Sequence, residues 1–290
     1  MALAEVLLEL VLIVSAMLAT ATLVIVGPRT IAAAVLDFRW RLEACLLPFA
    51  ALVVVLLLRV STRDIVQRLE RRVLRNNITP YLFELDQALF GTDPVAVLQS
   101  FQTEFLTSFF VFIYIYGYAF LLIFPFIAYF ALDEMDDLST LVVAFTANYA
   151  IGLVCYTLFI AFGPRNVDPL LFEGLLYDAF PQSRTLTNTV NQNTNVFPSL
   201  HTSLSMTVFV LAWVTREKYP LWLPVAGFIA ISVGLSTMYL GIHWFSDVVA
   251  GTLLALVSVY IGVNYTIEGM IESVRRFFEA KFRPSDVEGE

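Results

Sequence analysis

The chain has 290 residues, of which 59% are hydrophobic and 14% charged, and its mean hydropathy is +0.78. This composition excludes an ordinary soluble globular protein and indicates an integral membrane protein. The formal net charge of −8 leaves no extended basic surface outside the apolar segments, which excludes nucleic acid as a partner.

The first apolar segment, residues 3–27, is predicted to be a retained membrane anchor. It lacks the basic start of a signal peptide, contains Glu5 and Glu9, and stays apolar as far as Val26. A cleaved signal peptide is therefore the less favoured interpretation.

Further apolar segments long enough to cross a bilayer follow along the chain. They lie near residues 43–60, 104–132, 140–162, 199–215, 221–241 and 244–266. Together with the first segment they predict seven transmembrane helices, with six or eight as alternatives because the last two segments are nearly continuous. Basic residues are almost equally divided between the two sides, so their distribution does not fix the orientation.

The segment between the second and third spans, STRDIVQRLERRVLR at residues 61–75, is predicted to form an amphipathic helix. Its aliphatic side chains share one helical face, and its arginines lie largely on the others. Such a helix is typical of a membrane surface, where the arginines face lipid headgroups. The two cysteines, Cys45 and Cys155, lie in separate apolar spans and predict neither a disulfide framework nor a zinc site.

The first of only two histidines lies where a polar loop meets an apolar segment, in NVFPSLHTS at residues 195–203. Pro198 suits the first turn of a helix, and Ser199 is a good cap or hydrogen-bond donor. We therefore expect a helix to begin near residue 199 with His201 in its first turn. The free N–H groups of a helix N-terminus attract anions, so phosphate is the natural class of ligand.

The polar loop at residues 163–197 adds two arginines, Arg165 in FGPRNVDP and Arg184 in PQSRTLTN. Each could neutralise phosphate oxygens through paired N–H donors. The alternative is that either arginine anchors the protein to lipid headgroups.

The second histidine lies in STMYLGIHWFSDVVAG, residues 236–251, and is followed four residues later by Asp247. At the start of a helix this spacing places His243 and Asp247 on one face, where the carboxylate can accept a hydrogen bond from one imidazole nitrogen. The other nitrogen then keeps a free lone pair and can act as a nucleophile.

Connectivity predicts that both histidines lie at the same membrane face. His201 opens the span at 199–215, one further span crosses back, and His243 lies where that second span ends. The alternative is that both histidines are surface or packing residues at the interface. Their shared face, with arginine and serine nearby, favours a functional site.

These residues resemble two motifs of the type-2 phosphatidic acid phosphatase superfamily, the lipid phosphate phosphatases that share a helical core with vanadium haloperoxidases. The P-S-G-H motif is matched by Pro198, Ser199 and His201, with Leu200 in the glycine position. The family's earlier K-x6-R-P motif has only a partial counterpart in Pro164 and Arg165, and its lysine is absent.

The family's S-R-x5-H-x3-D motif is matched by Ser236, His243 and Asp247, with Thr237 in the arginine position. P-S-L-H combined with S-T-x5-H-x3-D is similar to the inositol phosphorylceramide synthase branch, whose members transfer a phospho-headgroup between lipids. The resemblance implies that His243 attacks phosphorus, that Asp247 orients it and that His201 protonates the departing oxygen. It further implies that Arg165, Ser199 and Ser236, with Arg184 as another candidate, bind phosphate oxygens. No metal and no cofactor are expected.

The sequence thus predicts an all-α, polytopic membrane bundle of about six to seven transmembrane helices with a phosphatase-like core. Its expected divisions are N-terminal helices at 1–60, an interfacial segment at 61–103, the core at 104–266 and a polar tail at 267–290. The leading function is hydrolysis of a lipid-linked phosphate or diphosphate, with membrane lipids and the lipid phosphate as partners. A lipid phosphotransferase and a non-catalytic lipid-binding protein are the alternatives. The resemblance implies a multi-pass protein of the cell membrane with an extracytoplasmic active site.

Overall fold

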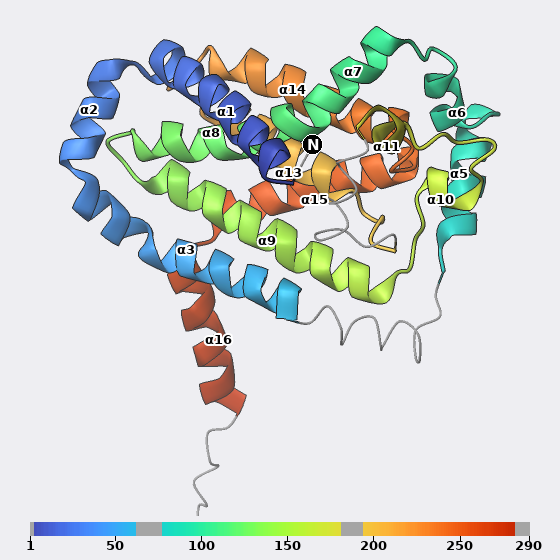
Figure 1. Cartoon of the computed structure of the whole chain (residues 1–290). Helices are drawn as coiled ribbons and strands as arrows, with labels where there is room; N and C mark the ends of the chain where they lie inside the picture. The colour runs from blue at the N-terminus through green and yellow to red at the C-terminus, as the bar shows by residue number, and fades with distance from the viewer. Residues whose placement is uncertain (1–2, 62–76, 181–193, 282–290) are drawn as a thin grey trace, which may run out of the picture.

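The computed structural model describes residues 3–61, 77–180 and 194–281 (Figure 1). Within these ranges the secondary structure is helical, apart from two isolated β-bridges. The predicted all-α class is therefore confirmed. The predicted surface helix at 61–75 lies outside the described residues except for Ser61, so it stays a prediction.

Six helices in the described part of the chain are long and apolar enough to cross a membrane. They are α1 with the π-helical turn η1 (Leu3–Ala21 and Thr22–Val26), α3 (Phe38–Ser61), the continuous α7–η3–α8 (Glu104–Phe112, Ile113–Gly117 and Tyr118–Phe130), α9 (Asp136–Leu158), α14 (Trp222–Tyr239) and α15 (Phe245–Asn264). Helices of this number, length and composition indicate an integral membrane protein.

The seventh predicted span is a shorter apolar helix, α13 (Leu200–Val214), with 15 residues. At the usual rise per residue it is about 22 Å long, less than the roughly 30 Å of a bilayer's hydrocarbon core. The described residues thus contain six helices of membrane length, one of the predicted alternatives, and a seventh apolar helix that is shorter. Ser199 and Thr215, the bounds of the predicted segment, are the polar caps at which α13 begins and ends.

The remaining described helices are short or peripheral. They are α2 (Pro28–Leu36), α5 (Thr79–Phe90), α6 (Pro94–Gln99), α10 (Pro164–Val167), α11 (Leu175–Ala179) and α16 (Ile267–Lys281). Helices α5 and α6 lie beside one end of the bundle, and α16 extends away from the bundle in Figure 1.

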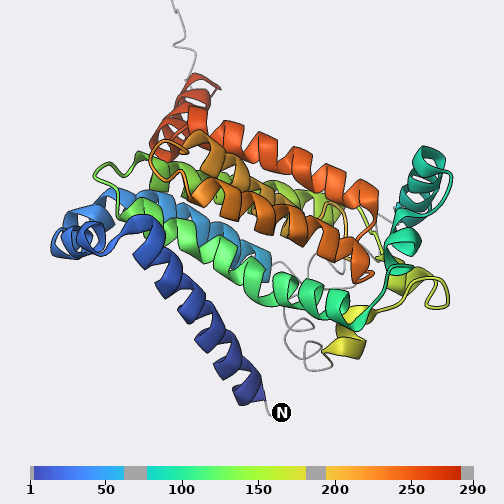
Figure 2. The same cartoon turned by 90° about the horizontal axis from the view of Figure 1, so that it is seen from above.

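Helix α13 is shorter than the neighbouring helices and is enclosed by them. It packs against α14, α15, α9 and α8, and these helices run side by side in the view of Figure 2. Leu204 and Val208 of α13 are consequently almost completely buried. This packing places the first turn of α13, which carries His201, inside one end of the bundle.

The two N-terminal spans have a different environment from the central helices. Only 11% of the apolar window of α1 and 17% of that of α3 is buried, against 67% for α14. Their exposed side chains are leucines and valines, for example Leu12 and Leu57. Apolar surface of this extent is stable when lipid covers it, so α1 and α3 form the lipid-facing edge of the bundle.

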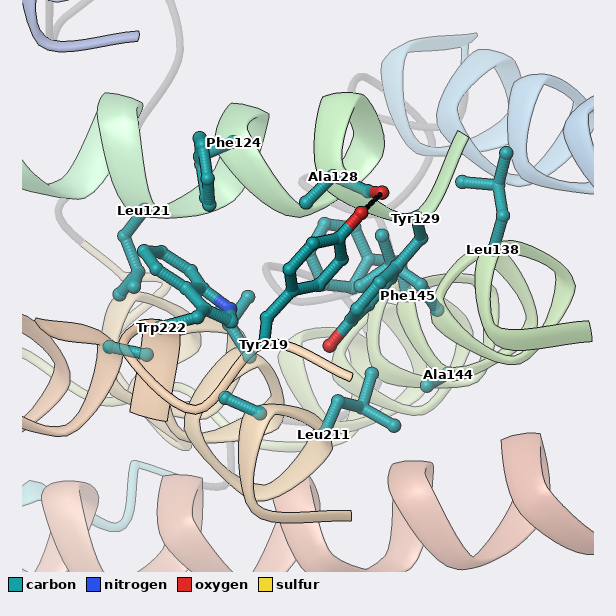
Figure 3. Close-up of a cluster of buried hydrophobic side chains, with 14 of the residues drawn as sticks. Leu121, Phe124, Ala128, Tyr129, Leu138, Ala144, Phe145, Leu211, Tyr219 and Trp222 are labelled. Atoms are coloured by element: carbon teal, nitrogen blue, oxygen red, sulfur yellow. Dashed lines mark hydrogen bonds between the residues drawn. The ribbon is translucent and has the colours of Figure 1, made fainter. Parts of the chain in front are cut away.

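The end of the bundle away from the histidines contains a large aromatic core (Figure 3). Trp222 is fully buried, with its ring centroid 4.5 Å from that of Phe124. The hydroxyl of Tyr219 donates a hydrogen bond to the carbonyl oxygen of Ala128 at 2.9 Å, as the dashed line in Figure 3 shows. The Tyr219 hydroxyl therefore has a partner, as buried polar groups usually do, whereas Nε1 of Trp222 makes no hydrogen bond with the described residues.

Candidate active site

The N-termini of α13 and α15 meet backbone to backbone. The N–H of Ser199 donates to the carbonyl oxygen of Asp247 at 3.1 Å. Gly251 permits this approach, because a Cβ atom there would lie 2.5 Å from the carbonyl oxygen of Ser199. The two helix ends that carry the histidine motifs are thus joined through main-chain atoms.

The turn before α15 is shaped by Gly241, whose φ of +71° favours glycine. After this residue the N–H groups of Ile242 and His243 both donate to the carbonyl oxygen of Thr237, at 2.9 and 3.1 Å. The chain therefore reverses within a few residues of the end of α14. His243 lies immediately ahead of the first turn of α15.

The structure brings His201, His243 and Asp247 together. The two imidazole centroids are 6.4 Å apart, although the residues come from different helices. Nδ1 of His243 lies 3.5 Å from Oδ2 of Asp247, which also accepts a hydrogen bond from the N–H of Trp244. Nδ1 of His243 and Oδ1 of Asp247 make no hydrogen bond with the described residues. Catalytic hydrogen bonds often shorten only when substrate binds, so the 3.5 Å separation is compatible with a functional pair.

Burial keeps the imidazole of His243 uncharged. His243 is 3% exposed, while His201 is partly exposed. Burial, followed by the positive charge of Arg165, lowers the pKa of His243 from 6.5 to about 3, against a smaller opposing effect from the carbonyl group of Val196. The ring is therefore neutral near pH 7 and retains a nitrogen lone pair.

Two tyrosines enclose His201, and sequence reasoning missed both of them. The Tyr114 ring stacks on His201 with centroids 4.8 Å apart, and the Tyr118 ring is 4.6 Å away. Both come from the π-helical turn η3 and the start of α8. A π-helical turn within a longer helix often marks a functional site. The alternation in YIYGY at residues 114–118 was the only available signal.

Arg165 is placed beside His243 by the short helix α10. Its N–H donates to the carbonyl oxygen of Gly241 at 3.1 Å, and Nη2 donates to the hydroxyl of Tyr177 at 3.0 Å. Its guanidinium carbon lies 4.4 Å from the centroid of the Tyr177 ring. Nη1 is buried and has no hydrogen-bond partner among the described residues. Arg165 thus contributes a positive charge and a buried N–H donor next to the histidine loop.

The expected phosphate-binding serines are buried beside the histidines, but their hydroxyls have protein partners. The Ser199 side chain caps α13 by accepting from the N–H of Thr202 at 3.3 Å. The Ser236 hydroxyl donates to the carbonyl oxygen of Val233 at 2.7 Å. A phosphate-binding role for Ser236 would therefore require its hydroxyl to rotate. Arg184 lies outside the described residues.

A buried acid on α5, which sequence reasoning also missed, holds the N-terminus of α15. Asp86 is completely buried, and its carboxylate accepts from the N–H groups of Phe245 and Ser246 at 2.8 and 3.0 Å. Burial raises the pKa of Asp86 to about 6, although these hydrogen bonds oppose the shift. An acid within the apolar run of YLFELDQALF was the available signal. Asp86 fixes the helix end on which His243 and Asp247 depend.

The described residues contain no cluster of three or more His, Cys, Asp and Glu side chains that could hold a metal ion. The arrangement at the site therefore consists of two imidazoles, one carboxylate, arginine and tyrosine. Such groups can bind an anion, supply a nitrogen nucleophile and transfer a proton.

Comparison with known families places the chain in a superfamily. The PAP2 superfamily model matches residues 80–261, which is more than half of the chain and includes both histidines. The chain belongs to the PAP2 superfamily. This result confirms the resemblance to the type-2 phosphatidic acid phosphatases, whereas the similarity to the inositol phosphorylceramide synthase branch stays a prediction.

One curated relative is phosphatidylglycerophosphatase B from Bacillus subtilis (strain 168). It is 29% identical to this chain over 97 residues, a match that covers 30% of this chain and 45% of the relative. The chain thus spans less than half of the length of this relative. No solved structure matches the chain significantly.

Proposed function

We propose that this PAP2 superfamily member is a lipid phosphate phosphatase that hydrolyses a lipid-linked phosphate or diphosphate through a phosphohistidine at His243. The observation that carries the proposal is the approach of two imidazoles to 6.4 Å, from separate helices, at one end of a membrane bundle. A phosphoryl group can contact both rings at once across that distance. The name of the Bacillus relative, a phosphatidylglycerophosphatase, agrees with a phospholipid substrate.

In the first half-reaction His243 is the nucleophile. Asp247 faces Nδ1, so Nε2 is the attacking nitrogen. The Nε2 lone pair forms a P–N bond as the bond between phosphorus and the lipid oxygen breaks. Asp247 stabilises the positive charge that the imidazole acquires, and the neutral ring is available without prior deprotonation near pH 7.

His201, in the protonated form that the second half-reaction regenerates, completes the transfer by giving a proton to the departing lipid oxygen. Proton transfer of this kind typically contributes about 10² to 10⁴ in rate. Arg165, with a buried Nη1 that has no partner among the described residues, donates to the phosphoryl oxygens as negative charge develops there. The N–H groups at the start of α13 add to that stabilisation.

In the second half-reaction water attacks the phosphohistidine. His201 takes a proton from the attacking water, the P–N bond breaks, and inorganic phosphate leaves while His243 returns to its neutral form. We place this chemistry at the extracytoplasmic face of the cell membrane, with the alkyl chains of the substrate among the helices. The bundle end that carries the histidines is then level with the headgroups.

Phosphate release by the purified chain tests the proposal. In lipid nanodiscs containing EDTA, the wild-type chain should release phosphate from phosphatidate or from a polyprenyl diphosphate, and His243→Ala should not. Lys218→Ala, which removes a surface ion pair with Asp137 away from the histidines, is the matched control and should keep its activity. Full turnover by His243→Ala would exclude the mechanism.

Two further measurements separate the proposal from its alternatives. A brief reaction with ³²P-labelled substrate should leave an alkali-stable, acid-labile label on the wild-type chain and none on His243→Ala. Movement of the labelled headgroup into a second lipid, with little free phosphate, would identify a phosphotransferase instead. Lipid binding without turnover by the wild-type chain and by His243→Ala would identify a non-catalytic protein.

A further inference from the structure

A second arginine approaches the histidines from a helix that the family match does not include. Arg59 lies near the C-terminal end of α3, ahead of the matched residues 80–261. Its guanidinium carbon is 5.4 Å from the centroid of the Tyr149 ring and 5.9 Å from that of Tyr156, both on α9. These distances allow cation–π contact, which fixes the direction of a long side chain without neutralising its charge.

Tyr156, one of the two rings beside Arg59, is connected to the chain just ahead of His201. The hydroxyl of Tyr156 donates to the carbonyl oxygen of Pro198 at 3.1 Å, just before the first turn of α13. Arg59 also interacts electrostatically with Tyr118, whose ring lies against His201, and with His201 itself. The charge of Arg59 is therefore on the His201 side of the site. The charge of Arg165 is on the His243 side.

Among the described residues, no carboxylate pairs with either of these arginines. The ion pairs of the described residues include neither Arg59 nor Arg165 within 4.0 Å. A phosphate monoester carries up to two negative charges near pH 7, so a single arginine leaves one of them uncompensated. Two cations, one beside each imidazole, match the charge of such a group.

We infer that Arg59 is a second phosphate-binding residue, which acts on the side of the departing lipid oxygen. This inference rests on the function proposed above. In it Arg59 donates N–H groups to phosphoryl oxygens and transfers no proton, and His201 remains the acid. Helix α3 then takes part in the active site, although it lies outside the matched family range and most of its surface faces lipid.

The test compares Arg59→Ala and Arg59→Lys with Arg216→Ala in the full chain in nanodiscs. Arg216 is the matched control, because its guanidinium carbon lies 5.4 Å from an aromatic ring, that of Trp213, at the other end of α13. We expect Arg59→Ala to raise the KM for phosphatidate and the inhibition constant of inorganic phosphate by about 10- to 100-fold. Arg59→Lys, which keeps the charge, should recover most of this loss, and Arg216→Ala should behave as wild type.

The outcomes distinguish the two proposals. An active wild-type chain together with an unchanged KM and inhibition constant in Arg59→Ala would overturn the role of Arg59 and leave the phosphatase function intact. That result would make Arg59 a headgroup anchor. A wild-type chain that neither releases phosphate nor gains thermal stability from inorganic phosphate would overturn both. If Arg59→Ala does not fold, Arg59→Gln and Arg59→Lys provide the same comparison with a side chain of similar length.

Discussion

Positively charged side chains have different partners at the two ends of the helical bundle. At the end away from the histidines, the buried Arg41 lies 3.7 Å from Asp133, and Lys218 pairs with Asp137. At the histidine end, Arg59 and Arg165 lie over tyrosine rings, and neither takes part in an ion pair within the described residues.

This difference distinguishes charged side chains that stabilise the fold from charged side chains that remain available for a ligand. Arg41 is close to two carboxylates and donates to two carbonyl oxygens, so its charge is compensated by the fold, although its Nε has no partner among the described residues. A buried donor without a partner, such as Nη1 of Arg165, costs stability unless a ligand completes it. We therefore expect substitutions at the two ends to separate activity from stability.

Among the substitutions that test this comparison, the largest loss of activity is expected for His201→Ala. Replacement by alanine should lower kcat for phosphatidate by about 10² to 10⁴, because the departing lipid oxygen is no longer protonated. A substrate with an acidic leaving group, such as an aryl phosphate, should lose much less, since its leaving group needs no proton. Equal losses for both substrates would contradict the role of His201 as an acid.

The next largest loss of activity is expected at one of two comparable glycines on α15. A Cβ atom at Gly251 would lie 2.5 Å from the carbonyl oxygen of Ser199, and one at Gly262 would lie 2.6 Å from that of Thr140. Both alanine variants should lose about 1–3 kcal/mol of stability through overpacking. Only Gly251→Ala shifts the helix end that carries His201, so it alone should lose about 10²-fold in kcat/KM. Thermal denaturation and phosphate release measure the two quantities separately.

An effect of about 10-fold is expected for Asp86→Asn, because an amide cannot accept from both N–H groups of α15 as a carboxylate does. The pKa of Asp86 is about 6, so wild-type kcat/KM should fall as the pH drops through 6, and the variant should lack this step. The control is Asp93→Asn, which changes a buried cap on α6 and should preserve the wild-type pH profile.

The raised pKa of Asp86 predicts that stability, in contrast to activity, falls as the pH rises. Burial raises its pKa above the ordinary 3.8, so between about pH 4 and pH 6 the folded chain binds more protons than the unfolded chain. The contribution of Asp86 to stability is then greatest below pH 4 and declines as the pH rises through 6. The melting temperature of wild type relative to Asp86→Asn should accordingly fall between pH 4.5 and 7. A difference in melting temperature that stays constant over this pH range would contradict a raised pKa at Asp86.

The smallest effect is expected at the end away from the histidines. Tyr219→Phe removes the hydrogen bond to the carbonyl oxygen of Ala128 and should cost about 1 kcal/mol, or roughly 2 °C in melting temperature for a protein of this size. Its kcat/KM should match that of wild type. A change in activity larger than the change in stability would show that the two ends are coupled.

The sequence was sufficient to predict the helical class and the approach of the two histidines. Hydropathy gives the spans, and one intervening span returns the chain to the same face, which is why His201 and His243 could be paired without coordinates. The four-residue spacing of His243 and Asp247 likewise follows from helix geometry.

Other parts of the site depend on contacts that no local pattern reports. Asp86 reaches Phe245 across 159 positions, and Tyr114 meets His201 through a π-helical turn that periodicity does not reveal. Arg59 reads in the sequence as an arginine at the end of a span. The motif spacing predicts where Ser236 lies in the chain, but it does not predict the side-chain rotamer. That rotamer directs the Ser236 hydroxyl to the carbonyl oxygen of Val233.

The main-chain hydrogen bond between Ser199 and Asp247 has a consequence for substitutions around the site. Because backbone atoms set the separation of the imidazoles, side chains elsewhere can be exchanged without altering it. In the function proposed above, substitutions in the surrounding loops can therefore change recognition of the lipid and leave this contact between the two helix ends in place.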